Sequence, residues 1–370
     1  MNKLLIVGQK PPPYHGQAIM IQELVKICSN FPEIKYVRMG FSTTTQSIGK
    51  FEFIKILELI KVIGKVWLYR FFHSCDVLYF PPTGGSNKIP LYRDFFILVF
   101  TRFLFKKTIF HFHAWGLHEI YPKLNILERY IFNISYKNPD LSIIMSSKGQ
   151  NDPLLLNSRN IRIIPNGIVN ALTLYNKEPV NRLIKHDFLT ILYVGILKES
   201  KGVNILLESS ILLKSKGYDF KVNFVGSFES EQYELVVKEF VMKNGLEHIV
   251  SFLGVKVGVE KDRLFKESDI FCFPTFYECE NFPNVIIEAM SYSLPVVTTD
   301  WRGISSIVLN EESGILCPIK EPNKIADSLE QLINDYKLRI AMGVNGKKKY
   351  DDKYTLEKFG FNMIDVFKSI

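Results

Sequence analysis

The sequence has 370 residues, of which 47% are hydrophobic and 23% charged, a balance that excludes a disordered chain and suits a globular protein of two domains. Its five cysteines form no C-x-x-C pair and mostly lie in apolar runs, which argues against disulfides or a zinc site and favours reduced thiols in a cytoplasmic protein. The net charge is +8, the first residues predict a core strand rather than a signal peptide, and no uncharged apolar stretch approaches the roughly 18 residues of a membrane span.

The first half of the chain alternates between strand-like and helix-like segments. Apolar runs that favour strands lie at Leu4–Val7, Val77–Phe80, Thr108–Phe112 and Leu141–Ile144. Helical periodicity lies between them, for example from Gln17 to Cys28 and from Phe51 to Tyr69. This alternation predicts a doubly wound α/β sheet.

Turn residues interrupt the alternation at Ile163–Gly167, and a polar stretch follows through residues 170–187. The alternation then restarts, with strands expected at Thr190–Val194, Lys221–Val225, Val250–Leu253 and Ile270–Phe273, and helices at Val203–Lys214, Glu231–Lys243 and Lys261–Glu267. We therefore expect two doubly wound, Rossmann-like domains with a cleft between them, over residues 1–167 and 168–354. A C-terminal helix over about residues 355–370 is expected to pack back on the first domain.

Two glutamates eight residues apart, Glu280 and Glu288, lie where a strand-like run ends and a helix begins. In an open parallel sheet, this edge is where ligands bind. Pro283 suits the first helical turn, and the free N–H groups of that turn, around Phe282 to Val285, suit a phosphate. A carboxylate on either side of the anion is placed to accept hydrogen bonds from hydroxyls. The pattern predicts a nucleotide sugar, with its ribose, diphosphate and sugar.

Lys201 lies at a similar strand-to-helix junction. It follows the strand-like run at Ile191–Val194 and opens the next helix. It is either a solvated helix-start lysine or a point charge on the diphosphate, and the neighbouring glutamate motif favours the second interpretation. The sequence has no D-x-D pair of the kind that clamps a diphosphate through a metal. A lysine with a helix N-terminus would replace the metal, so we expect neither a metal nor another cofactor.

The first strand runs into a glycine-containing loop that extends from Gly8 to Gly16. A glycine there lets the backbone approach a phosphate or sugar closely. The loop is not a G-x-G-x-x-G fingerprint and has no acidic residue at dinucleotide spacing, so NAD is not expected. The absence of a G-x-S-x-G elbow and of a Walker A loop argues against hydrolase and kinase chemistry.

Two histidines, His111 and His113, end a predicted strand on the same face. A metal site is not favoured, because no third ligand lies nearby in the sequence. We expect His113 to form hydrogen bonds in the cleft, His111 to pack in the core, and His118 to be a further cleft candidate.

Positive charge is concentrated in residues 1–165, which hold 21 Lys and Arg against 10 Asp and Glu, whereas the remaining residues hold 25 against 28. The basic half carries two apolar, basic segments, Phe51–Phe72 and Leu91–Phe112. These are either ordinary core helices with solvated lysines or a face that rests on an anionic membrane. Nothing resembles a motif for nucleic acid. The basic side chains concerned are Lys55, Lys61, Lys65, Arg102, Lys106 and Lys107.

Over nearly its whole length the chain resembles the GT-B glycosyltransferases of family 4. Residues 274–290 resemble the E-x7-E signature of that family, and Pro295–Thr299 and Gly303 also match. Further resemblances are a phosphate-binding segment at Tyr193–Val203, an interdomain linker at Ile163–Gly167, a base-contacting loop at Phe252–Gly254, and acceptor-side motifs at Pro11–Gly16 and His111–Ala114. The implied fold is GT-B, and the implied activity is retaining transfer of a sugar without a metal.

The resemblance also implies roles for individual residues. Glu288 would bind the ribose and Glu280 the transferred sugar, while Lys201 and the amides near Asn284 and Val285 would hold the diphosphate. Gly16 and His113 would face the reacting sugar from the first domain. The implied catalytic residues are Glu280, Lys201 and His113, and the implied donor-binding residues are Gly16, Gly254, Asn281, Phe282, Pro283, Asn284, Val285 and Glu288.

Two positions depart from the family pattern. Ile196 stands where an arginine is frequent, so another group is needed to supply the second cation of the diphosphate site. Asn281 stands where a glycine is frequent, which leaves the donor sugar open.

The sequence predicts a cytoplasmic glycosyltransferase that transfers a hexose-type sugar from a nucleotide diphosphate to an acceptor hydroxyl. The expected acceptor is a lipid-linked saccharide of bacterial surface polysaccharide synthesis, reached by peripheral contact with the inner face of the membrane. A GT-B sugar-nucleotide epimerase and a non-catalytic nucleotide-sugar-binding protein are the alternatives. The presence of both Glu280 and Glu288 argues against the non-catalytic alternative.

Overall fold

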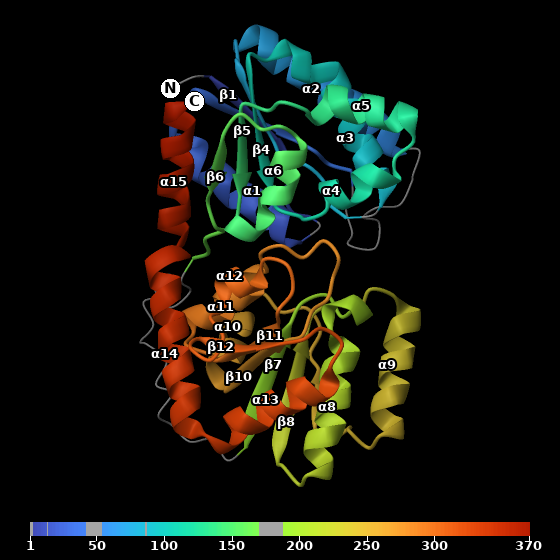
Figure 1. Cartoon of the computed structure of the whole chain (residues 1–370), viewed down its shortest axis with the longest axis vertical. Helices are drawn as coiled ribbons and strands as arrows, with labels where there is room; N and C mark the ends of the chain where they lie inside the picture. Colours follow the sequence, from blue (N-terminus) through green and yellow to red (C-terminus); the bar gives the residue numbers. More distant parts are fainter. Residues whose placement is uncertain (1–2, 13, 42–53, 86, 170–187) are drawn as a thin grey trace. The chain divides into compact units, whose positions relative to one another are not determined.

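The computed structural model describes residues 3–12, 14–41, 54–85, 87–169 and 188–370 (Figure 1). By their contacts they divide into two compact units, Met1–Gly167 with Glu357–Ile370, and Ile168–Leu356. Each unit holds one parallel six-stranded sheet with helices, which confirms the α/β, doubly wound fold class. The stretch at residues 170–187 and the expected start of a helix at Phe51 lie outside the described residues. In the described part, no helix is both long and apolar enough to cross a membrane.

The sheet of the first unit has the strand order β2-β1-β3-β4-β5-β6. Its strands are β1 (Leu4–Gly8), β2 (Ile34–Arg38), β3 (Val77–Phe80), β4 (Lys107–Phe112), β5 (Leu141–Ile144) and β6 (Ile161–Ile163). The central strands are almost wholly buried, as expected of a parallel sheet that is covered on both faces. Edge strand β2 is only half-buried.

The helices of the first unit include one from the far end of the sequence. They are α1 (Gly16–Ile27), α2 (Ile54–Phe72), α3 (Lys88–Thr101), α4 (Leu117–Ile120), α5 (Ile126–Tyr136), α6 (Asn151–Leu155) and α15 (Leu356–Ser369). Short 3₁₀ helices are η1 (Cys28–Asn30), η3 (Arg102–Leu104), η4 (Tyr121–Lys123) and η5 (Ser147–Gln150). Helix α15 buries Phe359, Met363 and Phe367, and the Phe367 ring lies 5.9 Å from that of Tyr79 on β3.

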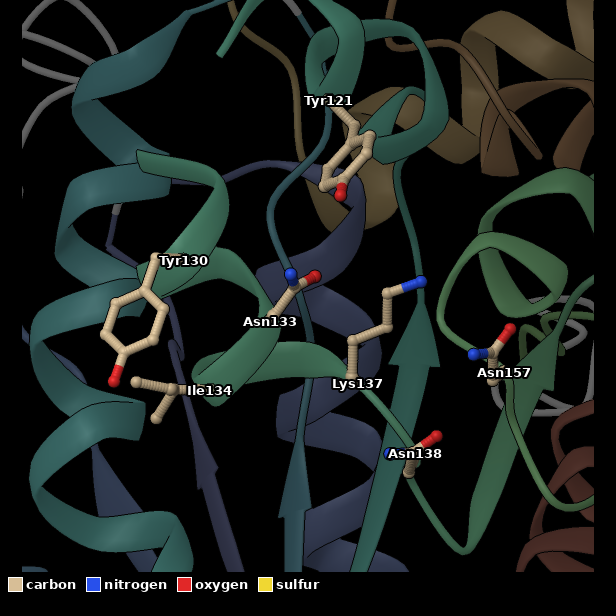
Figure 2. Close-up of a pocket in the computed structure, with 7 residues that line it drawn as sticks. All are labelled: Tyr121, Tyr130, Asn133, Ile134, Lys137, Asn138 and Asn157. Carbon is tan, nitrogen blue, oxygen red and sulfur yellow. The ribbon is translucent and has the colours of Figure 1, made fainter. Parts of the chain in front are cut away.

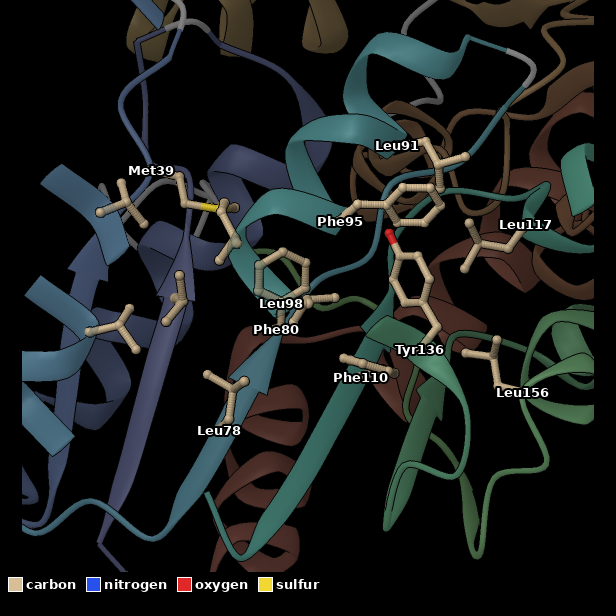
Figure 3. Close-up of a cluster of buried hydrophobic side chains, with 14 of the residues drawn as sticks. Met39, Leu78, Phe80, Leu91, Phe95, Leu98, Phe110, Leu117, Tyr136 and Leu156 are labelled. Carbon is tan, nitrogen blue, oxygen red and sulfur yellow. The ribbon is translucent and has the colours of Figure 1, made fainter. Parts of the chain in front are cut away.

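Aromatic side chains fill the core between the sheet and helices α3 and α5 (Figure 3). The ring of Tyr136 lies 6.0 Å from that of Phe95 and 5.7 Å from that of Phe110. The fully buried carboxylate of Asp94 accepts hydrogen bonds from the Tyr136 hydroxyl at 2.9 Å and the Thr83 amide at 2.8 Å. These bonds satisfy a charge that would otherwise be costly to bury, and they fix α3 against α5 and the loop after β3.

The sheet of the second unit has the order β12-β11-β10-β7-β8-β9. Its strands are β7 (Leu189–Val194), β8 (Phe220–Val225), β9 (Val250–Phe252), β10 (Ile270–Phe273), β11 (Val296–Thr299) and β12 (Gly314–Cys317). Its helices are η6 (Glu199–Lys201), α8 (Val203–Ser215), α9 (Glu231–Lys243), α10 (Gly258–Glu267), α11 (Asn284–Ser291), α12 (Ile304–Ile307), α13 (Pro322–Asn334) and α14 (Tyr336–Lys353). Because β7 and β10 pair in parallel, the loops that follow them meet at one edge of the sheet.

Candidate active site

The loops after β7 and β10 interlock at the carboxyl edge of the second sheet. Gly202 ends η6 with φ +86°, and a Cβ on it would lie 2.2 Å from the Pro274 carbonyl oxygen, so only glycine fits this approach. The amide of Phe276 donates to the Ser200 carbonyl at 2.8 Å. The buried Tyr193 hydroxyl lies 3.1 Å from the Ile196 carbonyl and 3.2 Å from the Lys201 carbonyl. These contacts hold the predicted phosphate segment in one conformation.

Lys201 and Glu280, which lie 79 residues apart in the sequence, form an ion pair at this edge. The Lys201 ammonium lies 2.6 Å from Glu280 Oε2, and both side chains are mostly buried. The Thr275 hydroxyl donates to the same carboxylate oxygen at 3.1 Å. The ammonium also lies 4.4 Å from the centroid of the Tyr277 ring. The sheet thus brings together two side chains that were predicted separately for the donor site.

A second cation, Lys198, lies on the same aromatic ring. Its ammonium is 5.7 Å from the centroid of Tyr277 and 3.2 Å from Glu229. It is more exposed than Lys201, with 39% of its side chain accessible against 17%. No sequence pattern singles out Lys198, because a lysine in a loop is most often solvated.

The loop after β10 ends at Pro283, which is the N-cap of α11, one residue before the helical turn in which it was expected. Asn281 and Phe282 are buried, and the Phe282 ring packs 5.5 Å from that of Tyr354. A Cβ on Gly303 would lie 2.1 Å from the Asn281 carbonyl oxygen, so α12 approaches this loop at a glycine. Asn284 and Val285 open α11, whose first N–H groups suit an anion.

Glu288 lies in the second turn of α11 and pairs with Lys261 of α10. The Lys261 ammonium is 2.5 Å from Glu288 Oε1, and this carboxylate raises the pKa of Lys261. Helix α10 was expected, but the sequence contains no signal that pairs its lysine with Glu288. The proposed base-contacting residue Gly254 follows β9 with φ +69°, and its carbonyl accepts from the Gly226 amide at 2.9 Å.

The first unit places its candidates at the carboxyl edge of its own sheet. Gly16 opens α1, and His15 caps that helix by accepting a hydrogen bond from the Ala18 amide. His113 follows β4, and the centroid of its ring lies 4.0 Å from that of His111. The Nδ1 atom of His111 is hydrogen-bonded to the Tyr79 hydroxyl at 2.6 Å. Within the part of the chain that the structure describes, neither buried ring nitrogen of His113 has a hydrogen-bond partner.

The two imidazoles at this edge are held neutral by their surroundings. Burial, together with the nearby His15, lowers the pKa of His113 to about 3. Burial also lowers the pKa of His15 to about 4, with a contribution from the Arg93 charge. Neutral imidazoles suit uncharged hydroxyl groups better than phosphates. His118, the further candidate, is instead held by Asp152, whose carboxylate lies 2.6 Å from His118 Nδ1 and accepts the His118 amide at 2.8 Å.

No group of three or more His, Cys, Asp or Glu side chains is arranged to hold a metal ion among the described residues. The charged groups described at the carboxyl edge of the second unit are the pairs Lys201–Glu280, Lys198–Glu229 and Lys261–Glu288. Glu280 precedes α11 by four residues, and Glu288 lies in its second turn. Such an arrangement can bind a diphosphate between two groups of hydroxyls.

Known proteins resemble this chain in both sequence and structure. Residues 176–349 match the model of the glycosyl transferases group 1 family. An uncharacterized glycosyltransferase of Methanocaldococcus jannaschii is 30% identical over 255 residues, which cover 69% of this chain and 67% of that protein. The capsular polysaccharide biosynthesis glycosyltransferase CapM of Staphylococcus aureus is 31% identical over 179 residues, 48% of this chain and 45% of CapM. The chain thus spans about half the length of CapM.

Two solved structures match the whole chain at 16% identity and therefore bear on its fold alone. Sucrose-phosphate synthase from Thermosynechococcus elongatus has a TM-score of 0.76 over 100% of this chain and 99% of that one. The Anabaena protein HepE, solved in complex with UDP, has a TM-score of 0.72 over 100% of both chains. Together with the two parallel sheets, these matches confirm a GT-B fold. The chain belongs to the group 1 family of glycosyltransferases.

Proposed function

We propose that this glycosyltransferase uses a nucleoside diphosphate sugar as its donor and a saccharide hydroxyl as its acceptor. The observation that carries the proposal is the Lys201–Glu280 pair, 2.6 Å apart beside the N-terminus of α11. The diphosphate would lie between the Lys201 ammonium and the amides of Asn284 and Val285. Glu280 would accept hydroxyls of the transferred sugar, and Glu288 those of the ribose.

Lys198 is proposed as the second cation on the leaving diphosphate, the position that Ile196 leaves without an arginine. It shares the Tyr277 ring with Lys201, at 5.7 Å against 4.4 Å. Lys201 is already paired with Glu280, so part of its charge is neutralised before the donor binds. Lys198 is also paired, with Glu229 at 3.2 Å, but it is more exposed than Lys201, so its ammonium would turn to the departing phosphate oxygens when the donor binds.

The reaction is proposed to retain the anomeric configuration. The bond from the anomeric carbon to the diphosphate oxygen breaks, the acceptor oxygen bonds to that carbon on the same face, and the hydroxyl proton passes to the departing phosphate. This course needs no separate base, in keeping with the low pKa of His113, whose neutral imidazole would position a sugar hydroxyl. The charge stabilisation would come from the lysines and the helix N-terminus rather than from a metal.

The acceptor is proposed to be a lipid-linked saccharide of surface polysaccharide synthesis. Support comes from relatives named for such pathways, CapM and the amylovoran biosynthesis glycosyltransferase AmsK of Erwinia amylovora. A lipid-linked acceptor would also bring the protein to the inner face of the membrane.

An exposed aromatic surface on the first unit supports that membrane contact. Trp67 of α2 lies 6.1 Å from the Phe71 ring and 6.4 Å from the Phe103 ring, and all three side chains are exposed. Two lysines of the same segments, Lys61 on α2 and Lys106 after η3, are also exposed, and they pair with Glu58 and Asp76 respectively. Aromatic rings with basic neighbours suit the interface of an anionic bilayer.

Of the other basic residues expected there, Arg102 does not belong to this surface, and Lys107 is exposed but bonded to the end of the chain. The Arg102 guanidinium points inward, donates to the Ser135 carbonyl at 2.9 Å and packs over the Phe110 ring. The Lys107 ammonium donates to the Ile370 carbonyl at 2.8 Å. The side chain of Lys55 lies outside the described residues.

The proposal is tested by screening nucleoside diphosphates and their sugars for thermal stabilisation of the full chain, in the presence and absence of a chelator. A specific donor at a hundred times its Kd stabilises the folded state by about 2.7 kcal/mol. Stabilisation that persists under chelation is the expected result. Absence of stabilisation by every nucleotide, or its complete dependence on a divalent ion, would contradict the proposal. Interconversion of the donor sugar without an acceptor would indicate the epimerase instead.

A further inference from the structure

A groove on the first unit lies between helices α5 and α6 and has a volume of about 620 Å³ (Figure 2). This volume is in the range of ligand sites. Its lining is polar and partly aromatic, and consists of Tyr121, Tyr130, Asn133, Ile134, Lys137, Asn138 and Asn157. Figure 2 shows Asn133 and Lys137 extending from α5, with Tyr121 at one end of the groove and Asn138 at the other.

Backbone and side-chain bonds fix the two walls of the groove. The Asn138 amide donates to the Leu156 carbonyl at 2.7 Å, which joins the chain after α5 to the end of α6. The Lys137 ammonium donates to the Leu155 carbonyl and so crosses the floor of the groove. The groove therefore exists before any ligand binds, which lowers the entropic cost of binding.

Neighbouring side chains fix the position of the Tyr121 ring. The Phe132 ring lies 4.9 Å from it, and the Arg129 guanidinium and Lys137 ammonium lie 5.6 Å and 5.9 Å from its centroid. Because these two cations lie over the ring, the part of Tyr121 against which a sugar ring can pack is its edge.

The three asparagines give the groove its recognition chemistry. Each side-chain amide offers an NH₂ donor and a C=O acceptor side by side. Two neighbouring sugar hydroxyls can pair with them, one by accepting from the NH₂ and the other by donating to the C=O. The side chains of Asn133, Asn138 and Asn157 are all exposed, so all three are available to a ligand. Asn138 and Asn157 also suit the left-handed backbone at their positions, with φ +54° and +53°. Lys137 is the only charged residue in the lining, which is too little positive charge for a nucleic acid.

The groove runs away from the carboxyl edge of the first sheet. Tyr121 directly follows α4, which follows the end of β4, whereas Asn138 lies three residues before β5 begins. A chain that starts at the carboxyl edge, where the acceptor hydroxyl is proposed to react, can extend along the groove towards the opposite edge.

We propose that this groove binds a saccharide, namely the part of the acceptor that lies several sugar units from the reacting hydroxyl. The inference rests on the proposed function, since it takes the acceptor to be an oligosaccharide. Hydroxyl pairs of the saccharide bond to Asn133 and Asn157, and one sugar ring packs against Tyr121. The groove would determine the length of acceptor that the enzyme prefers, although it would not contact the reacting atoms.

The test measures binding of defined tetrasaccharides to the full chain by ligand-observed NMR, with α- and β-linked glucose, galactose and N-acetylglucosamine tetramers as probes. The variant carries Asn133→Ala and Asn157→Gly together, with glycine at 157 because the backbone there has φ +53°, which alanine tolerates poorly. The control is Leu127→Ala, an exposed side chain on the same helix outside the groove. Loss of two polar contacts predicts a Kd raised roughly tenfold for the variant and unchanged for the control. Nucleoside diphosphate binding is measured on all three proteins.

Binding of at least one tetrasaccharide, weakened in the asparagine variant alone, supports the proposal. Failure of every tetrasaccharide to bind, or equal binding to the variant, overturns it. Nucleoside diphosphate binding separates this outcome from failure of the proposed function, because the donor site lies on the second unit and is untouched by the substitutions. A protein that binds the nucleotide but no saccharide refutes the groove alone, whereas loss of nucleotide binding in the unmodified protein refutes the donor assignment.

Discussion

At the scale of single residues, the proposed donor site is built from two ammonium–carboxylate pairs. Neither Lys201–Glu280 nor Lys261–Glu288 lies on the open surface, so each pair carries a desolvation cost that a purely structural ion pair rarely repays. Such pairs are more readily understood if a bound ligand replaces one member of the pair as the partner of the other. Three predictions follow this reasoning at the level of the side chain.

Replacing Lys201 by Ala should lower turnover more than it weakens donor binding. Negative charge grows on the diphosphate as the glycosidic bond breaks, so the ammonium is worth most in the transition state. By analogy with the loss of one preorganised donor, kcat should fall roughly 10²–10³-fold. Steady-state kinetics with the donor found by the thermal screen measures kcat, and calorimetry measures donor Kd.

Lys198→Gln should give a smaller loss of the same kind, because this lysine lies farther from Tyr277 and is more exposed. Lys243→Gln, at the end of α9, is the matched control. A normal kcat in the Lys201 variant would show that another group stabilises the leaving diphosphate.

Replacing Glu288 by Gln should weaken binding of the nucleoside diphosphate product itself. Loss of a charged hydrogen bond to the ribose costs about 1.5–3 kcal/mol, which is roughly a tenfold to hundredfold rise in Kd. The substitution also leaves Lys261 without its carboxylate, so Lys261→Met is combined with it to separate the two effects. Calorimetry with UDP and GDP gives the affinity, and Glu267→Gln on α10 is the control. Unchanged affinity in both Glu288 variants would remove the ribose assignment.

The buried imidazoles of the first unit predict a pH-dependent stability. Their pKa values are lowered from the usual 6.5 to about 4 for His15 and about 3 for His113. Between these values and 6.5 the unfolded chain binds protons that the folded chain does not, so stability is present above pH 6.5 and is lost as the pH falls towards 3. Urea unfolding from pH 7 to pH 4 measures the slope. The combined His15→Asn and His113→Asn variant should reduce the slope, and the remainder comes from His111, whose pKa burial also lowers. The exposed His248→Asn control should leave the slope unchanged, and equal slopes in both variants would contradict the pKa values.

At the scale of elements, the strands that could best be predicted from the sequence are those marked by a continuous apolar run. Strands β1, β3, β4, β5, β7, β8 and β10 are apolar runs, and the structure has each within one or two residues of the expected range. Strand β2 was not predicted, because its alternation of apolar and basic residues, Ile34-Lys-Tyr-Val-Arg38, is that of a half-buried edge and is weak in isolation. Strand β6 was also not predicted, and with three residues it is shorter and more exposed than β2.

The candidate site was predictable only where a motif is continuous in the sequence. Glu280, Pro283 and Glu288 belong to one segment, and the order of strand, loop and helix places them at a carboxyl edge. Lys261 and Lys198 were missed because they meet this segment only through the pairing of strands and the packing of α10. The inward turn of Arg102 was missed for the same reason, since its partner Ser135 lies on another helix.

The exposed surface of α2 and η3 predicts weak, reversible binding to anionic vesicles. Each lysine near such a membrane contributes about 1 kcal/mol, and salt screens the attraction. The combined Lys61→Gln, Lys65→Gln and Lys106→Gln variant should therefore bind roughly a hundredfold more weakly at low salt. Sedimentation with phosphatidylserine vesicles at low and high salt measures this, with Lys238→Gln and Lys243→Gln on α9 as the control. Failure of the unmodified protein to bind at low salt would leave α2 and α3 as ordinary core helices.

At the scale of the whole molecule, the two units differ in how the chain builds them. The second unit is continuous from Ile168 to Leu356, whereas the first is completed by residues that come last in the sequence. Helix α15 buries Phe359, Met363 and Phe367 in the first unit, and it packs so closely that the Cδ1 atom of Ile27 lies 3.1 Å from where a Cβ on Gly360 would stand. Both ends of the chain thus contribute to one hydrophobic core.

Removing residues 357–370 should therefore unfold or loosen the first unit and spare the second. Burial of each large apolar side chain contributes about 1.5–3 kcal/mol, so losing the three on α15 removes an amount comparable to the whole stability of a domain. Hydrogen exchange followed by mass spectrometry should show loss of protection in β1, β3 and α1, with protection retained in β7 and β10. Calorimetry should show nucleoside diphosphate binding retained, because Lys201, Glu280 and Glu288 all lie in the second unit. Phe361→Ala, an exposed position on the same helix, is the control and should leave both units protected. Full protection of the first unit in the shortened chain would show that α15 is dispensable, and loss of nucleotide binding would show that the second unit does not carry the donor site alone.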